Sequence, residues 1–319
     1  MAKRPHKQLS DAKNNKNDEF YTLYSDIEAE CDKYAHEFVG KIVYCNCDNP
    51  YKSNFFRYFI ERFYSFGIKK LIFTCYSNAS KLREVSIWGD DDELPEGYNP
   101  ALPERPYKLE ISDTDNIEEV SCYPEHFITY LDGDGDFRSE ECVQILKESD
   151  IVVTNPPFSL FSEFVSLMSK YNKKFLVVGN KNGITNKDVF SMFVENKIWF
   201  GYTVPENFIT PDGTYADNMA GLTRWYTNLD VNSRHNHLVL TKTFSEHEYP
   251  KYVNYDAIEV SRVCDIPKGY TGVMGVPLTF LDKYNPEEFE IIWKSDDIQW
   301  AKGSCDFYKP LTEEEKKYY

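Results

Sequence analysis

The residues best suited to chemistry in this sequence are Asn155-Pro156-Pro157-Phe158, which follow the short apolar run 151–154. The two prolines donate no backbone N–H and fix φ at about −65°, so the segment cannot continue a helix or a central strand. Pro157 also favours an extended conformation at Pro156. We therefore predict a rigid turn at the carboxyl end of a strand, the edge at which open α/β sheets bind ligands. An amide, a carbonyl and an aromatic ring on one turn suit the binding of a planar base that bears an amino group.

A second polar segment, residues 132–137, alternates aspartate and glycine and invites comparison with a calcium-binding loop. An EF-hand loop has glycine at its sixth position and glutamate at its twelfth. Counting from Asp132, these positions hold Phe137 and Val143, which excludes a calcium loop. Gly135-Asp136-Phe137 at the end of a predicted strand instead suits a carboxylate and a ring that face a nucleoside.

Two other classes of site are not indicated. The pairs Cys45-x-Cys47 and His235-x-His237 lack the spacing of a structural zinc site, and no second cysteine pair accompanies them, so we expect no metal. The sequence also lacks the nucleophile-elbow motif of serine hydrolases.

Alternating strands and helices must position these residues. Short apolar runs predict buried strands, and apolar residues at helical spacing predict the helices between them. The order strand, helix, strand over residues 41–76 indicates a right-handed parallel crossover, the unit of a nucleotide-binding sheet. The loop at residues 45–50 has no glycine, which argues against a dinucleotide site of the dehydrogenase type. Strands are predicted at 41–50 with the terminal turn, 69–76, 107–111, 128–131, 150–154, 174–180, 199–202, 223–228 and 238–243, and helices at 25–38, 53–66, 140–147 and 162–171.

The two ends of the chain differ from this core. Basic residues and few apolar ones over 1–16 predict a mobile arm that could lie along a phosphate backbone. A frayed terminus explains the same residues equally well. Ser25, with Glu28 at capping-box spacing, is expected to begin the first helix. Beyond residue 245, glycine and proline punctuation predicts a loop-rich region.

Composition limits the class of protein. With 319 residues, 41% of them hydrophobic and 28% charged, the chain can form one large or two ordinary domains. No apolar run approaches a membrane span and no signal peptide is evident. Eight scattered cysteines fit reduced thiols, so we expect a cytoplasmic protein. A formal net charge of −16 argues against a surface that is basic throughout, but a basic cleft on an acidic protein can still bind nucleic acid.

Three motifs together resemble one enzyme family. Asn155-Pro156-Pro157-Phe158 after an apolar strand resembles the catalytic motif of amino-group DNA methyltransferases. Asn17-Asp18-Glu19-Phe20-Tyr21-Thr22 resembles the N-terminal cofactor motif of the adenine-specific enzymes. With residues 41–50 and Gly135-Asp136-Phe137 in this order, the chain resembles the EcoRI-type adenine-specific DNA methyltransferase family.

The resemblance implies an architecture of the α/β class. It implies a Rossmann-like sheet that binds S-adenosylmethionine, followed by a loop-rich C-terminal target-recognition region. Residues 1–16 would be the basic arm, residues 17–185 the catalytic and cofactor-binding core, and residues 186–319 the remaining core strands with the DNA target-recognition region.

The resemblance also implies a mechanism. The amino group of adenine is a poor nucleophile because its lone pair is delocalised into the ring. Hydrogen bonds to the Asn155 side-chain oxygen and the Pro156 carbonyl would favour a tetrahedral nitrogen that attacks the sulfonium methyl of the cofactor. The base must leave the duplex to be reached, and Phe158 would stack on it. Trp225 and Tyr226 are candidates for the opposite face of the base, and ordinary core positions are the alternative for both.

For the cofactor, the resemblance assigns the N-terminal motif to the methionine end and Asp136 and Phe137 to the adenine end. The loop after the first strand departs from the glycine-rich pattern that is usual in such enzymes. The residues expected to bind S-adenosylmethionine are Asp18, Phe20, Tyr21, Thr22, Cys45, Asp48, Tyr76, Asp136 and Phe137.

Double-stranded DNA is the expected partner, with no membrane, a monomeric state, and a restriction endonuclease acting on the same DNA site without direct contact. Two alternatives stay open. The protein could methylate adenine in RNA, because Asn-Pro-Pro-Phe does not specify the polymer. It could also be a catalytically silent protein that binds DNA or cofactor, because the glycine-rich loop is missing.

Overall fold

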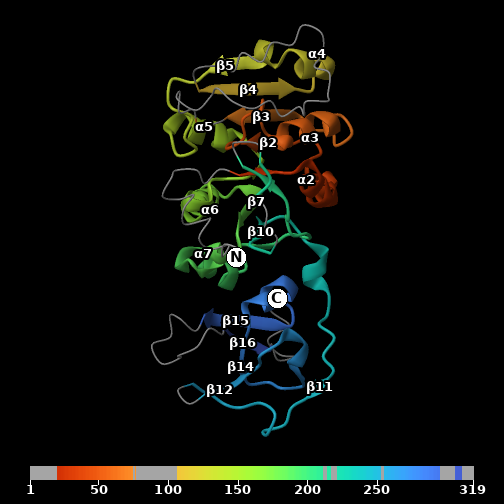
Figure 1. The fold of residues 1–319 in the computed structure, drawn as a ribbon, viewed down its shortest axis with the longest axis vertical. Helices are drawn as coiled ribbons and strands as arrows, with labels where there is room; N and C mark the ends of the chain where they lie inside the picture. The colour runs from red at the N-terminus through yellow and green to blue at the C-terminus, as the bar shows by residue number, and fades with distance from the viewer. Residues whose placement is uncertain are drawn as a thin grey trace. The chain divides into compact units, whose positions relative to one another are not determined.

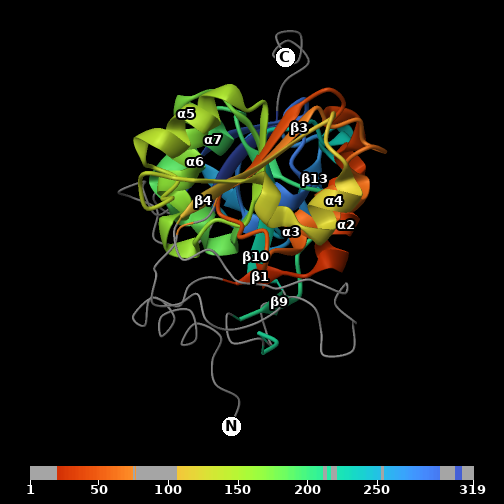
Figure 2. The ribbon, with the colours of Figure 1, turned by 90° about the horizontal axis from the view of Figure 1, so that it is seen from above.

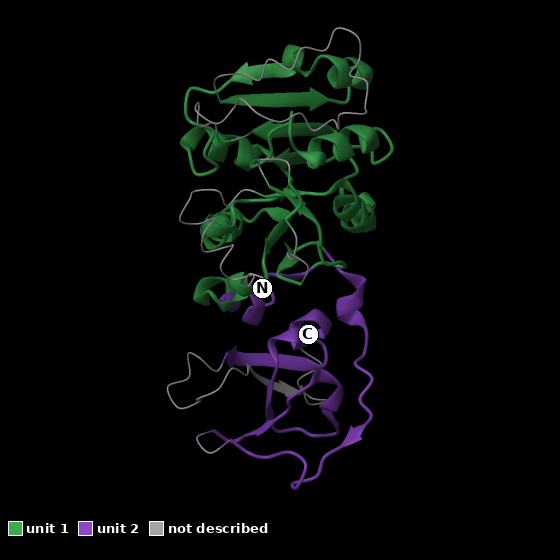
Figure 3. Ribbon diagram, viewed as in Figure 1, with its two compact units in different colours: residues 1–189, 201–229 green, residues 190–200, 230–319 purple. Residues whose placement is uncertain are grey.

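The computed structural model describes residues 20–74, 76, 106–210, 214–216, 221–252, 255–294 and 306–310. The chain divides into two compact units (Figure 3). Unit 1 consists of residues 1–189 and 201–229, and unit 2 consists of residues 190–200 and 230–319. The Asn-Pro-Pro-Phe segment belongs to unit 1.

A mixed β-sheet forms the centre of unit 1 (Figure 1). The strands of this sheet that belong to unit 1 lie in the order β5-β4-β3-β2-β6-β7-β10. Neighbours among β3, β2, β6 and β7 are parallel, whereas β4, β5 and β10 pair antiparallel. The carboxyl ends of the four parallel strands therefore share one edge, where α/β sheets bind ligands. The bounds are β2 (Ile42–Cys45), β3 (Lys70–Thr74), β4 (Tyr107–Ser112), β5 (Ile128–Tyr130), β6 (Ile151–Thr154), β7 (Lys174–Asn180) and β10 (Thr223–Thr227).

The central strands are apolar on both faces, as fits a sheet with helices on both sides. All four residues of β6 are buried, as is β7 from Phe175 to Gly179. On β2, Tyr44 lies in register with Ile72 of β3 and Val152 of β6. Because these strands are buried on both faces, their sequences are continuous apolar runs and lack the alternation of a half-exposed strand.

Helices flank this sheet on both faces (Figure 2). In Figures 1 and 2, α5 and α6 lie on one face, and α2, α3 and α4 lie on the other. The α-helices are α2 (Tyr24–Cys31), α3 (Asn54–Arg62), α4 (Ile117–Cys122), α5 (Glu140–Glu148), α6 (Phe161–Lys170) and α7 (Lys187–Val194). The 3₁₀ helices of unit 1 are η1 (Asp32–Glu37), η2 (Pro124–Phe127), η3 (Phe158–Leu160) and η4 (Lys181–Thr185). Those of unit 2 are η5 (Asn232–His235), η6 (Val263–Asp265) and η7 (Leu278–Lys283).

Helix α2 begins at Tyr24, one residue before the predicted cap. Its N-cap residue is Leu23, which makes no side-chain capping bond, so the prediction of a Ser25 cap is wrong. The glutamate expected in the capping box, Glu28, instead accepts a hydrogen bond from Arg62 Nη2 of α3 at 2.5 Å. Glu28 thus forms an ion pair with a residue of another helix, whereas the local sequence pattern assigned its side chain to the helix cap.

A short antiparallel ribbon pairs β1 (Tyr21–Thr22) with β9 (Phe208–Ile209). Its register sets Tyr21 opposite Ile209 and Thr22 opposite Phe208. The chain turns back after β9, because the Ala216 N–H donates to the Phe208 carbonyl at 2.8 Å. The N-terminal motif is thus joined to a segment almost 190 residues further along the chain.

Unit 2 contains a small sheet of its own in the order β12-β14-β16-β15, and a parallel pair, β11 with β13. The region beyond residue 245, which the sequence predicted to be loop-rich, therefore holds an ordered sheet. Its strands span three to six residues each, so their sequences show little periodicity. The bounds are β8 (Trp199–Phe200), β11 (Lys242–Thr243), β12 (Ala257–Glu259), β13 (Pro267–Lys268), β14 (Val273–Val276), β15 (Phe289–Lys294) and β16 (Asp306–Pro310).

Three absences hold for the described ranges. No helix there is long and apolar enough to cross a membrane. The cysteines in these ranges are free thiols. The histidine, cysteine and acidic side chains in the same ranges form no group of three that could hold a metal ion.

Candidate active site

The Asn-Pro-Pro-Phe segment lies at the carboxyl end of β6, as predicted. The strand ends at Thr154, and η3 begins directly after Pro157, whose φ of −54° and ψ of 126° keep the chain extended. The Leu160 N–H donates to the Pro157 carbonyl at 3.0 Å and closes the turn. The turn is short, and it follows a strand that is buried along its whole length.

The Asn155 amide is held in one orientation. Its Nδ2 donates to the Phe20 carbonyl at 2.5 Å and to Thr22 Oγ1 at 3.2 Å. A carbonyl oxygen only accepts hydrogen bonds, so the amide must direct its NH₂ group toward Phe20. The other amide atom, Oδ1, is buried and has no hydrogen-bond partner among the described residues. A buried acceptor without a donor costs about 1–3 kcal/mol, which a ligand N–H placed there would offset.

Asp48 joins the loop after β2 to the end of β6. It is buried and accepts hydrogen bonds from Thr154 Oγ1 at 2.5 Å and from Ser53 Oγ at 2.7 Å. Burial raises the pKa of its carboxyl from 3.8 to about 6, although these hydrogen bonds oppose the rise. Asp48 thus holds Thr154, the residue before Asn155, and its expected contact with the methionine end of the cofactor stays a prediction.

Three phenylalanine rings gather beside Asn155. Phe158 stacks on Phe20, with centroids 5.7 Å apart and an angle of 26° between the ring planes. Phe208 presents its edge to Phe158 at 6.4 Å. Phe158 and Phe20 are half-buried and Phe208 is buried. The half-buried Phe158 ring remains available for stacking, and Phe208 is a neighbour that sequence reasoning missed because a two-residue strand leaves no periodic signal.

Trp225 and Tyr226 lie in the core of unit 1. Both belong to β10 and both are 0% exposed. Trp225 packs edge-on against Phe55 at 6.2 Å, and Tyr226 packs against Phe161 at 4.6 Å. Because every residue of β10 is buried, both faces of the strand are enclosed. These positions correct the expectation of base stacking and favour the alternative, ordinary core aromatics.

Arg138 engages the Asp136 carboxylate. Oδ1 accepts from the Arg138 backbone N–H at 2.8 Å and from Nε at 2.9 Å, and Oδ2 accepts from Nη2 at 2.7 Å. These bonds hold the pKa of Asp136 below its ordinary value. An ionised carboxylate has further lone pairs, so Asp136 can still accept from a cofactor amino group. The Phe137 ring, by contrast, is 4% exposed and packs on Phe164 at 5.1 Å, which favours a core position over the expected contact with the cofactor.

The remaining predicted cofactor residues differ in how accessible they are. Cys45 is 0% exposed, so its side chain belongs to the core and only its backbone borders the loop that follows. Tyr76, beyond the end of β3, is 51% exposed, and its ring is open to stacking. Tyr21 is half-buried in β1 beside the buried Thr22. Asp18 lies outside the described residues.

Asn46 is a candidate ligand residue that sequence reasoning missed. It directly follows β2, is 1% exposed, and its Nδ2 has no hydrogen-bond partner among the described residues. A buried donor at the carboxyl end of a parallel strand suits a ligand carboxylate or carbonyl. The available signal was its place immediately after an apolar run, two residues before Asp48.

A mixed α/β unit with an Asn-Pro-Pro-Phe turn after a central parallel strand, and an acceptor amide at that turn, defines an amino-group methyltransferase. Residues 8–317 match the family described as "Adenine-specific methyltransferase EcoRI". The chain belongs to this family and is an adenine-specific DNA methyltransferase.

Named relatives agree with this membership. The chain is 42% identical to the Type II methyltransferase M.EcoRI of Escherichia coli, over 96% of each chain. It is 36% identical to the Type II methyltransferase M.MpnI of Mycoplasma pneumoniae, over 88% of this chain and 83% of the relative. No solved structure matches it significantly.

Proposed function

We propose that this chain moves a methyl group from S-adenosylmethionine to the exocyclic 6-amino group of an adenine flipped out of duplex DNA. The observation that carries the proposal is the Asn155 amide. Its NH₂ group is fixed by Phe20 and Thr22, and its buried Oδ1 lacks a donor among the described residues. An amino group of a base supplies that donor.

The roles at the base follow from the turn. Asn155 Oδ1 and the Pro156 carbonyl accept the two amino hydrogens, which favours tetrahedral geometry at the nitrogen and frees its lone pair. Phe158 stacks on the extruded ring. S-adenosylmethionine, when bound, supplies an electrophilic sulfonium methyl group. The protein contributes position and electrostatics, and no covalent enzyme intermediate is needed.

The described residues fit the cofactor at the carboxyl ends of β2 and β3. The parallel order β3-β2-β6-β7 supports a Rossmann-like binding sheet. The orphaned Asn46 Nδ2 suits a carboxylate such as that of the methionine moiety, the exposed Tyr76 ring suits stacking, and Asp136 retains lone pairs for an amino group. One donor, one acceptor and one ring thus take the place of the missing glycine-rich loop.

Duplex DNA is the proposed substrate, with target recognition by the region 186–319. The net charge of −16 requires any basic surface to be local, and the arm at residues 1–16 has the composition for phosphate contacts. We further propose a cytoplasmic monomer, and a restriction endonuclease that acts on the same DNA site.

The test measures transfer of labelled methyl from S-adenosylmethionine to adenine in duplex DNA of varied sequence, with single-stranded RNA as a parallel substrate. We expect incorporation into DNA at the adenine amino group. Asn155→Ala should reduce the rate by about 100-fold or more, by analogy with the loss of one transition-state hydrogen bond. Its affinity for the cofactor, measured by calorimetry, should be unchanged.

Three outcomes contradict the proposal. Methylation of RNA but not of DNA would show that RNA is the substrate. A wild-type chain that binds cofactor without transferring methyl would assign a silent binding role. A fully active Asn155→Ala variant would remove the amide from the mechanism.

A further inference from the structure

The N-terminal strand β1 contacts the catalytic amide directly. Asn155 Nδ2 donates two hydrogen bonds here, one to the carbonyl of Phe20, the residue before β1, and one to Thr22 Oγ1 within the strand. Thr22 is 2% exposed, so solvent does not replace its hydroxyl as an acceptor. If the amide were reversed, Oδ1 would face the Phe20 carbonyl, and two acceptors at such a distance repel. The acceptors on β1 therefore decide which way Oδ1 points.

The protein holds β1 in place from two sides. The Thr22 carbonyl accepts a hydrogen bond from Asn54 Nδ2 of α3 at 2.9 Å. On its other edge, β1 pairs with β9, and the Leu23 N–H donates to the Asn207 carbonyl at 3.4 Å. Thr22 thus cannot shift without breaking contacts to two elements distant in sequence.

Helix α2 in turn fixes the segment that leads into β9. Asp26 Oδ2 accepts from the backbone N–H groups of Glu206 at 3.0 Å and Asn207 at 2.9 Å. The buried Glu30 accepts from the Thr203 N–H at 2.6 Å and from its hydroxyl at 2.7 Å. Gly201 permits this approach, because a Cβ there would lie 2.1 Å from Glu30 Oε1.

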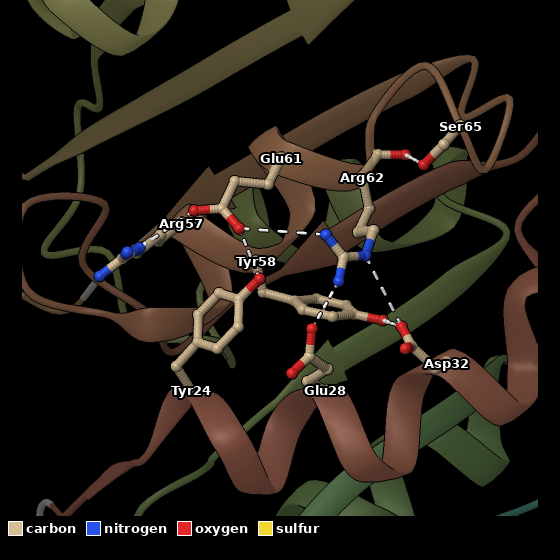
Figure 4. A network of polar contacts seen from close by, with 8 residues as sticks. All are labelled: Tyr24, Glu28, Asp32, Arg57, Tyr58, Glu61, Arg62 and Ser65. Atoms are coloured by element: carbon tan, nitrogen blue, oxygen red, sulfur yellow. Dashed lines mark hydrogen bonds and ion pairs between the residues drawn. The ribbon is translucent and has the colours of Figure 1, made fainter.

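A polar network anchors α2 to α3 (Figure 4). Tyr58 donates to Asp32 at 2.7 Å, and Arg62 lies over the Tyr58 ring and donates to Glu28 at 2.5 Å. At the start of the helix, Tyr24 donates to Glu61 at 2.5 Å. Continuous contacts therefore run from α3 and α2 through the segment 201–209 to β1 and the Asn155 amide.

We propose that Thr22 is a positioning residue for methyl transfer, which together with the Phe20 carbonyl orients the Asn155 amide so that Oδ1 faces the target amino group. The family resemblance assigns this strand to the cofactor, whereas the contacts assign it to the base side of the site. The inference rests on the proposed role of Asn155. It predicts that Thr22 affects the rate of transfer and leaves cofactor affinity unchanged.

The test compares Thr22→Val with Thr22→Ser. Valine keeps the β-branched shape that suits the strand but removes the acceptor, and serine keeps the hydroxyl. Single-turnover transfer is measured with saturating S-adenosylmethionine and duplex DNA, and cofactor affinity by calorimetry. We expect Thr22→Val to be about 10- to 100-fold slower, because a misoriented catalytic group costs up to that factor. Thr22→Ser should stay within about threefold of wild type, and both cofactor affinities within about twofold.

A double variant shows whether Thr22 acts through Asn155. In the Asn155→Ala background, Thr22→Val should cause no further loss of rate, because residues that act as a unit are not additive. Thermal melting of each variant separates misfolding from misorientation, since an unfolded Thr22→Val chain would also lose cofactor binding.

Three results overturn the inference. These are full activity of Thr22→Val, a rate loss matched by an equal loss of cofactor affinity, and an additive loss in the double variant. A fully active Asn155→Ala variant would instead contradict the proposed function itself, so the two failures are distinguishable.

Discussion

Asp48 makes the stability of this protein depend on pH in the direction opposite to that of a salt-bridged aspartate. Its carboxyl is 5% exposed, and burial raises its pKa from 3.8 to about 6. The folded chain therefore binds a proton more tightly than the unfolded chain does. The stabilising contribution of this group is full below pH 3.8 and is lost as the pH rises through about 6. A tenfold change in proton affinity is worth about 1.4 kcal/mol, so the whole contribution is about 3 kcal/mol.

Asp48→Asn removes the titration and keeps one side-chain carbonyl as an acceptor. Integration of the proton linkage between pH 8 and pH 5 gives the wild type a gain of about 1.4 kcal/mol relative to this variant. The measurement is the free energy of unfolding in urea at pH 8, 7, 6 and 5, followed by tryptophan fluorescence. Asp113→Asn, at an exposed position, serves as the matched control for the loss of one negative charge.

The result that refutes this reasoning is a constant difference between wild type and Asp48→Asn over the whole range. It would mean that the hydrogen bonds to the Asp48 carboxylate offset or outweigh the effect of burial on its pKa.

Two further substitutions test the core of unit 1 and the contacts between α2 and the segment 201–209. Tyr226→Phe removes a hydroxyl that donates to the Asn180 carbonyl at 2.9 Å, and we expect a loss of about 1 kcal/mol in urea with a transfer rate within about twofold of wild type. A large loss of transfer rate at unchanged stability would instead support a contact between Tyr226 and the target base. Glu30→Ala leaves the half-buried N–H and hydroxyl of Thr203 without their acceptor and should cost about 2–4 kcal/mol. Equal stability in the same assay would show that this carboxylate does not hold the segment.

The parallel strands were predictable because a strand that is buried on both faces has a continuous apolar sequence. β6 and β7 appear in the structure close to the predicted bounds, and the turn at Asn155 follows from the prolines alone. The strands of unit 2 were harder to predict. β11 spans two residues and pairs with β13, so the predicted strand at 238–243 is confirmed only at its end. A strand of that length has no period, and only its distant partner defines it.

The aromatic residues of β10 also show what the sequence alone does not predict. The sequence placed Trp225 and Tyr226 on a strand, which is correct, but could not say that this strand is enclosed on both faces. Enclosure depends on what packs against β10, including Phe55 and Phe161, which are distant in the sequence. A ring suited to stacking on a base is equally suited to a core, and only the packing decides between the two.

The direction of the catalytic amide is the clearest case of a property that no motif contains. Asn155-Pro156-Pro157-Phe158 specifies an amide at the end of a strand, but an isolated amide can rotate to present either its oxygen or its nitrogen. The two acceptors that choose between these orientations, Phe20 and Thr22, lie 135 and 133 residues away in sequence. Asp48 accepts a hydrogen bond from the hydroxyl of Thr154, the residue before Asn155, which lies 106 residues further along the chain. Because these contacts form only when β1, β2 and β6 are assembled, the acceptor that the chemistry requires is a property of the folded unit.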